Sequence, residues 1–251
     1  ALGGNSADSL LGDSQTNLIG GGLGDDTLVG GLGEDTLSYA SSLLSSSGVT
    51  VDLGLGAAFG AAGNDSFTGF EAAVGSAGND SLAGSSANEL LEGGIGDDTL
   101  SGGLGLDTLS YFDMTTTGTT TNDDDFLGGN SRAVTVDLGA GLAFGAGGND
   151  VLSGFEAVIT SWGNDSILGD AQGNFVSSSV GNDTLVGLAG NDTLSGEMAS
   201  DSLAGGAGDD SLVGGSTAGN DPRFPDMDWA YYGAASGAVT VDLITNRATG
   251  A

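Results

Sequence analysis

The sequence predicts an all-β chain whose short parallel strands coil and stack into one continuous solenoid. Three features lead to this fold class: glycine recurs every nine residues, an acidic residue follows it at a fixed interval, and a large apolar residue completes each unit. The 251 residues include 50 Gly, 2 Pro and no Cys. A repeat this short cannot bury its apolar side chains alone, so the repeats have to stack on one another.

The nine-residue unit is G-G-x-G-x-D-x-U-x, in which U is a large apolar residue. Its most regular copies begin at Gly21 and Gly30, with Asp26 and Asp35 at the sixth position. Glycine permits the left-handed backbone angles of a tight turn. The x-U-x triplet is a short strand whose middle side chain points inward. Two units make one right-handed coil, with a strand on each side and a turn at each edge, and the stack is a right-handed parallel β-roll.

The predicted roll is a single unit that spans residues 1–251. Nonapeptide runs occupy residues 3–38, 75–110 and 160–213, and wider-coil modules occupy residues 39–74, 111–159 and 228–251. Each module contains V-T-V-D-L, whose alternation of apolar and polar residues predicts a half-buried strand. The second module carries an insertion at 112–133, which we expect to be an exposed loop. That loop is either a solvated insertion, the interpretation we favour, or an added cation or ligand site.

The charge of the chain limits its partners. There are 34 acidic and 3 basic residues, giving a formal net charge of -31. Phosphates would be repelled, which excludes nucleic acid and anionic lipid as electrostatic partners. The sequence also has no apolar stretch of about 18 residues, so we expect no direct membrane insertion. A chain of this charge fits a protein that is neutralised by bound cations.

The residue types present argue against catalysis. The chain has no His and no Cys, which excludes a Ser-His triad and the usual zinc ligands. A G-x-S-x-G nucleophile motif is also absent. We therefore expect that this chain is not an enzyme.

The glycine and aspartate pattern of the three runs resembles the hemolysin-type calcium-binding repeats of the RTX family. The resemblance implies that calcium ions lie between turns two repeats apart on the same edge. It also implies that their ligands are the sixth-position side chains and the carbonyl oxygens of the glycine-rich turn. Such an all-oxygen ligand set suits calcium. We expect an extended chain without calcium and a folded one with multiple Ca²⁺ bound.

The resemblance gives a set of candidate metal ligands. These are Asp8, Asn17, Asp26, Asp35, Asp65, Asp80, Asp98, Asp107, Asp150, Asp165, Asp183, Asp192, Asp201 and Asp210. The regular pairs are Asp8 with Asp26, Asp80 with Asp98, Asp165 with Asp183, Asp183 with Asp201, and Asp192 with Asp210. The less regular pairs are Asn17 with Asp35, Glu89 with Asp107, and Asn174 with Asp192. Eight sites would add roughly 16 positive charges. For Glu71 and Glu156, calcium ligation and turn capping stay open.

Two functional classes fit the sequence. In the first, the chain is a structural segment of a larger secreted, extracellular protein that forms part of a surface layer, filament or adhesin stalk attached to the cell surface. Apolar residues at the third turn position, Leu23, Leu32, Ile95 and Leu104, predict self-association or contact with other surface proteins. In the second, the chain is the calcium-binding segment of a toxin or exoenzyme whose active domain lies elsewhere. Ice binding is disfavoured, because Ala62 and Ala77 stand where a threonine ladder would be needed.

Overall fold

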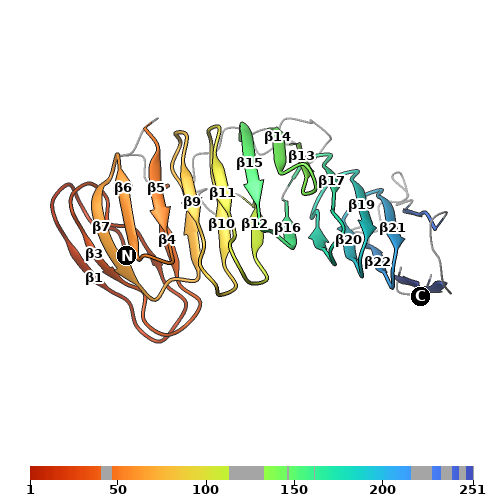
Figure 1. Cartoon of the computed structure of the whole chain (residues 1–251), viewed down its shortest axis with the longest axis horizontal. Coiled ribbons are helices and arrows are strands. Elements are labelled where there is room, and N and C mark those ends of the chain that lie inside the picture. Colours follow the sequence, from red (N-terminus) through yellow and green to blue (C-terminus); the bar gives the residue numbers. More distant parts are fainter. Residues whose placement is uncertain are drawn as a thin grey trace. The chain divides into compact units, whose positions relative to one another are not determined.

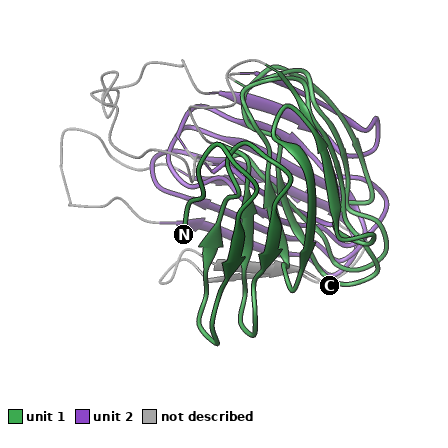
Figure 2. Cartoon of the chain, turned by 90° about the vertical axis from the view of Figure 1, so that its left-hand side faces the viewer, with its two compact units in different colours: residues 1–111, 147–155 green, residues 112–146, 156–251 purple. Residues whose placement is uncertain are grey.

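A computed structural model of the chain describes residues 1–40, 47–112, 133–145, 147–160, 162–215, 228–232, 239–242 and 247–250. Within these residues there are strands and turns but no helix, and most strands pair in parallel. The fold class is the predicted parallel β-roll. Most of the 112–133 insertion lies outside the described residues. The chain divides into two compact units, residues 1–111 with 147–155 and residues 112–146 with 156–251, which Figure 2 shows in separate colours.

The first unit has two rows of hydrogen-bonded strands. One row runs β1 (Ser9–Leu11), β3 (Thr27–Val29), β7 (Gly63–Thr68), β6 (Ala57–Gly60), β5 (Val49–Asp52), β9 (Ser81–Ala83), β11 (Thr99–Ser101) and, after an interruption in the sequence, β15 (Asn149–Ser153). The other row runs β2 (Leu18–Ile19), β4 (Thr36–Ser38), β8 (Ala72–Val74), β10 (Leu90–Glu92) and β12 (Thr108–Ser110). Consecutive nonapeptides alternate between the two rows (Figure 1).

The second unit repeats this arrangement. One row runs β14 (Leu142–Gly145), β13 (Val134–Asp137), β17 (Ser166–Leu168), β19 (Thr184–Ala189), β21 (Ser202–Ala207) and β23 (Trp229–Ala230). The other row runs β16 (Ala157–Ile159), β18 (Phe175–Ser177), β20 (Thr193–Glu197), β22 (Ser211–Gly215), β25 (Arg247–Gly250) and β24 (Val239–Asp242). In this row, β25 pairs antiparallel with both β22 and β24.

The core is a ladder of the apolar U residues. Within a nonapeptide run, each strand pairs in register with the strand two repeats later, so that Leu82 lies beside Leu100 and Leu185 beside Leu203. These leucines are at most 1% exposed, which confirms the inward orientation that the repeat predicts. Each buried leucine contributes about 1.5–3 kcal/mol from the apolar surface it removes from water. Because the strands are only a few residues long, this thin ladder is most of the core that each coil possesses.

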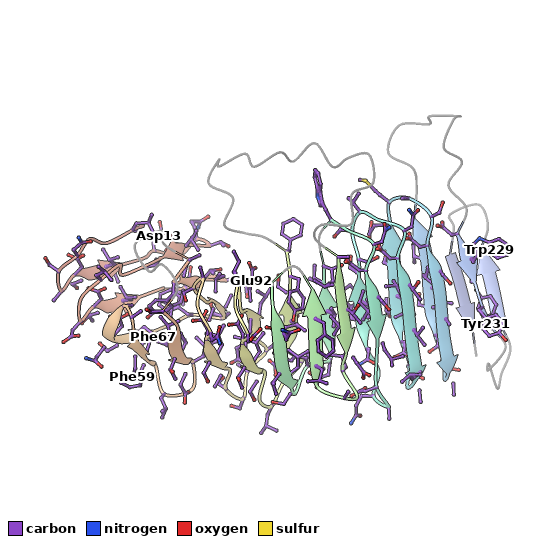
Figure 3. All side chains as sticks on the ribbon, turned by 90° about the horizontal axis from the view of Figure 1, so that it is seen from above. Asp13, Phe59, Phe67, Glu92, Trp229 and Tyr231 are labelled. Carbon is purple, nitrogen blue, oxygen red and sulfur yellow. The ribbon has the colours of Figure 1, made fainter. Side chains whose placement is uncertain are left out.

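The V-T-V-D-L segments form the predicted half-buried strands, β5 and β13, in which the two valines are buried and the threonine is exposed. The structure adds antiparallel pairing that the sequence pattern did not indicate. In the first module β5 pairs antiparallel with β6, and β6 pairs antiparallel with β7. The reversals use glycines with positive φ, at Gly56 (64°) and Gly60 (124°). This meander buries Phe67 and leaves Phe59 on the outside (Figure 3).

The side chains at the turns lie partly where the sequence predicts. Leu32, Ile95 and Leu104 are 74%, 64% and 74% exposed, whereas Leu23 is half-buried. Tyr39 is packed in the core. Trp229 and Tyr231 are both exposed at β23 and beyond it in the second unit (Figure 3). Apolar side chains at turns therefore do meet solvent in the first unit, and aromatic side chains at the last described parallel strand do so in the second.

Candidate metal centre

The sixth-position side chains form a ladder of hydrogen bonds between successive coils. In each step, one side-chain oxygen accepts a hydrogen bond from the backbone amide of the sixth-position residue two repeats earlier. The Oδ1 atom of Asp26 lies 2.7 Å from the Asp8 amide nitrogen, and that of Asp98 lies 2.8 Å from the Asp80 amide nitrogen. All eight pairs inferred from the sequence are brought together in this way, including the three less regular ones.

The second oxygen of several of these carboxylates is buried without a hydrogen-bond donor. This holds for Oδ2 of Asp26, Asp35, Asp98 and Asp192, and for Oε2 of Glu89. A buried polar atom without a partner costs free energy, and a charged one costs much more. These oxygens are therefore the atoms of the turn that most need an additional partner.

The first glycine of each repeat creates the space beside that second oxygen. A Cβ atom added to Gly30 would lie 1.8 Å from the carbonyl oxygen of Gly69 and 2.8 Å from Oδ2 of Asp35. At Gly187 the corresponding distances are 2.7 Å to the Gly205 oxygen and 2.2 Å to Asp192 Oδ2. The absence of a side chain thus leaves a gap lined by a carboxylate oxygen and a carbonyl oxygen from successive coils. Oxygen donors of these two types are the ligands that calcium prefers.

The electrostatics of the turns favour a bound cation. Burial raises the pKa of Asp98 to about 7, with the neighbouring charges of Asp80 and Asp150 adding to the effect and the Asp80 amide opposing it. Burial likewise raises the pKa of Asp183 to about 7 and that of Asp192 to about 6. Raised values mean that the ionised carboxylate is disfavoured in its site. A positive ion would remove that cost.

Not every ladder carboxylate has a free second oxygen. In Asp8 and Asp80 this oxygen accepts a hydrogen bond from the amide of the second residue of the same repeat, Gly4 or Ser76. Asp65 and Asp150 extend the ladder, because their Oδ1 atoms accept from the Asp26 and Asp98 amides at 2.9 and 3.0 Å.

In Asp65 and Asp150 a tyrosine hydroxyl takes up the second oxygen. Tyr39 donates to Asp65 at 2.8 Å, and Tyr111 donates to Asp150 at 2.6 Å. Burial raises the pKa of both tyrosines well above the ordinary value, and the adjacent carboxylate adds to the effect. Both tyrosines therefore stay protonated as donors.

Two members of the ladder extend the set inferred from the sequence. Glu71, for which ligation and capping were left open, accepts a hydrogen bond from the Asp35 amide, with an N···Oε2 distance of 2.9 Å. Asp228 was missed; its Oδ1 atom accepts from the Asp201 amide at 3.1 Å, and its Oδ2 atom lies beside the gap at Gly214. The nine-residue spacing could not reveal Asp228, because 27 residues separate it from its partner instead of 18. The available signal was the pair Gly214-Gly215, which resembles the start of a repeat and precedes Asp228 in the sequence.

The turn that lacks two expected glycines keeps its geometry at a cost. In the repeat that begins at Gly196, Glu197 and Ala199 adopt φ angles of 69° and 82°. These are left-handed angles like those of Gly22 and Gly24 in the regular repeat at Gly21. A residue other than glycine that adopts left-handed backbone angles costs roughly 1–2 kcal/mol of folding free energy. The carboxylate of Asp201 is buried nonetheless, so the departure adds strain without removing the turn.

Carbonyl groups are essential to any cation site in these turns. Among the residues that the structure describes, no group of three or more acidic side chains gathers at one point. A cation would therefore be held by one or two carboxylates together with backbone oxygens. This is the donor set that the turn glycines expose.

A family model for the RTX calcium-binding nonapeptide repeat, built on four copies of the unit, matches residues 2–37, 74–109, 159–194, 177–212 and 195–221. The matched segments cover more than half of the chain. The chain belongs to the RTX calcium-binding nonapeptide repeat family. RTX repeats bind calcium ions, and this chain carries multiple copies of them. No curated protein matches the chain.

Membership of the family has two further consequences. RTX repeats are structural rather than catalytic, and proteins that carry them are typically secreted. In the described part of the chain, no helix has the length and apolar character needed to cross a membrane.

Proposed function

We propose that the chain is a calcium-dependent structural β-roll of a secreted, bacterial-type protein, and that it contributes to a cell-surface layer, filament or adhesin stalk. The observation that carries the calcium part of this proposal is the row of buried carboxylate oxygens that lack donors and face glycine-lined gaps. Calcium would neutralise these oxygens and draw successive coils together. Without it, the mutual repulsion of stacked carboxylates opposes folding.

The proposed ligands fall into two groups. Asp26, Asp35, Asp98 and Asp192 each offer a buried oxygen without a donor. A backbone carbonyl from the next coil lies beside that oxygen at Asp35 and Asp192, supplied by Gly69 and Gly205. The remaining ladder residues, Asp8, Asn17, Asp80, Asp107, Asp165, Asp183, Asp201 and Asp210, hold equivalent places in the repeat. Asp65 and Asp150 share their second oxygens with tyrosines, so we propose them as the weaker ligands.

The structural role is supported by what the turns expose. Leu32, Ile95 and Leu104 are largely exposed although they are large and apolar. Such side chains are typical of surfaces that contact another protein. The net charge of -31 would oppose self-association, and bound calcium would reduce that repulsion. Assembly should therefore require calcium as well as the leucine and isoleucine side chains.

Self-association can be tested on the purified chain. Size-exclusion chromatography with light scattering, followed by electron microscopy, would compare samples in calcium and in chelator. We expect oligomers or filaments only with calcium, and their loss in a Leu32→Ser/Ile95→Ser/Leu104→Ser variant that still folds. A monomer at all concentrations in calcium would reject the structural role. It would favour the alternative, a calcium-binding segment of a toxin or exoenzyme whose active domain lies outside this chain.

A further inference from the structure

One row of turns in the second unit departs from the repeat at the position that matters for calcium. The first residue of the repeat is glycine in most copies, but Thr160 and Ser178 hold it in two copies that lie 18 residues apart. Both side chains are completely buried, with 0% of their surface exposed. The sixth-position residues of these copies, Asp165 and Asp183, are otherwise regular and form the usual ladder bond at 2.8 Å.

The hydroxyl groups of this row bridge the coils. Thr160 Oγ1 donates to the carbonyl oxygen of Ser178 at 3.1 Å, and Ser178 Oγ donates to that of Gly196 at 3.2 Å. Ser179 Oγ, from the second position of its repeat, donates to the Thr160 carbonyl at 2.7 Å. We name Thr160, Ser178 and Ser179 the hydroxyl row. The backbone carbonyl of the first residue of each repeat in this row therefore accepts a hydrogen bond from a hydroxyl group.

The same hydroxyl groups also lie against the carboxylates. Burial is the main effect on the pKa of Asp165 and Asp183 and raises both, whereas the side chains of Thr160 and Ser178 act in the opposite direction. A hydroxyl at position 1 thus contacts the same two kinds of oxygen, carboxylate and carbonyl, that line the gap beside a position-1 glycine.

Space decides what each row can hold. At Gly187, in the opposite row of turns, a Cβ atom would lie only 2.2 Å from Asp192 Oδ2 and 2.7 Å from the Gly205 carbonyl. With glycine at this position, the space between these two oxygens holds no side chain. At Thr160 and Ser178 a side chain does fill it. Calcium needs six to eight oxygens at about 2.3–2.6 Å, and a threonine or serine side chain in that volume prevents them from converging.

We propose that the hydroxyl row replaces calcium between the coils of Thr160, Ser178 and Gly196, so that Asp165 and Asp183 leave the set of proposed calcium ligands. These two steps are closed by hydrogen bonds from side chains, while the opposite row at Gly169, Gly187 and Gly205 keeps the ion gaps. The inference rests on the proposed function, because it assumes that calcium fills the other turns. It implies that one edge of this stretch holds its coils together at calcium concentrations too low for the rest of the chain.

The number of calcium ions bound by the full chain tests the proposal, measured by native mass spectrometry and by equilibrium dialysis. We expect Thr160→Gly/Ser178→Gly to bind two more ions than the unmodified chain. Gly187→Ser, which introduces the same hydroxyl into the opposite row, should bind one ion fewer and keep its β-signal in saturating calcium. Ser166→Gly, which removes an exposed serine from the strand that follows Thr160, is the control and should leave the number unchanged.

The outcomes separate the proposal from the function on which it rests. An unmodified chain that binds no calcium rejects the proposed function itself. A chain that binds calcium, but whose folded double variant gains no ion, rejects the hydroxyl row as a replacement. If the double variant does not fold, Gly187→Ser decides alone, since a folded Gly187→Ser chain with its full complement of ions also overturns the proposal.

Discussion

Replacing Asp98 by Asn should change stability in opposite directions with and without calcium. Asparagine keeps the Oδ1 acceptor that binds the Asp80 amide at 2.8 Å, but it removes the charge at a side chain that is 1% exposed. The rise in pKa from 3.8 to about 7 corresponds to about 4 kcal/mol against the ionised form. Burial of the asparagine NH2 group in place of the second oxygen costs about 1–3 kcal/mol, which leaves a net gain of about 2 kcal/mol. Without calcium, Asp98→Asn should stabilise the fold by about that amount at pH 8.

With calcium the same substitution should be destabilising, because a charged ligand is lost. The loss of an interaction with a charged group costs roughly 1.5–3 kcal/mol, so a higher calcium concentration should be needed for folding. Circular dichroism would measure both effects, by titration with calcium and by titration with trimethylamine N-oxide in chelator, an osmolyte that favours burial. Asp97→Asn is the matched control, because it removes an exposed charge from the same turn. If Asp98→Asn needs more osmolyte in chelator and no more calcium than the unmodified chain, the carboxylate is not a calcium ligand.

Three further outcomes follow from the structure. Ala199→Gly should stabilise the chain by roughly 1 kcal/mol in urea unfolding with calcium, because φ at Ala199 is 82° and glycine adopts this angle without strain. The control Ala189→Gly, within β19, should destabilise the chain. Equal effects of the two substitutions would contradict backbone strain at Ala199. Leu100→Ala should cost about 2–5 kcal/mol in the same assay, whereas Leu104→Ala at 74% exposed should cost little; similar losses would mean that the ladder is not the core. In chelator, the β-signal should increase as the pH falls from 8 to 5. The folded-state pKa values of Asp98, Asp183 and Asp192 are about 7, 7 and 6, above the unfolded value of about 4, so protonation of these carboxylates favours the fold. A β-signal that decreases over this pH range would contradict the raised pKa values.

The period of the sequence was sufficient to predict the parallel coils. Because the repeat fixes both the turn glycines and the inward leucine, residues such as Leu82 and Leu100 had only one register in which to stack. The ladder pairs were implied by the resemblance to the RTX repeats, including Asn17 with Asp35, where an amide group replaces one of the two carboxylates.

Features that depend on contacts between distant segments could not be predicted. The meander from β5 to β7 has no nine-residue period, and its antiparallel pairing depends on turns at Gly56 and Gly60 that resemble the other glycine turns in sequence. The bonds of Tyr39 to Asp65 and Tyr111 to Asp150 span 26 and 39 residues. Thr160 and Ser178 were visible only as departures from glycine, and their meaning depends on the carbonyl groups one coil away.

Circular dichroism of the purified chain, during a titration with calcium after chelation, tests the central claim most directly. A chain whose carboxylates require calcium should gain β-signal cooperatively, and an equal concentration of magnesium should not reproduce the gain, since magnesium requires a stricter octahedral geometry and gives up its water reluctantly. A chain that is already folded in chelator at pH 8, or that does not respond to calcium, would contradict the account.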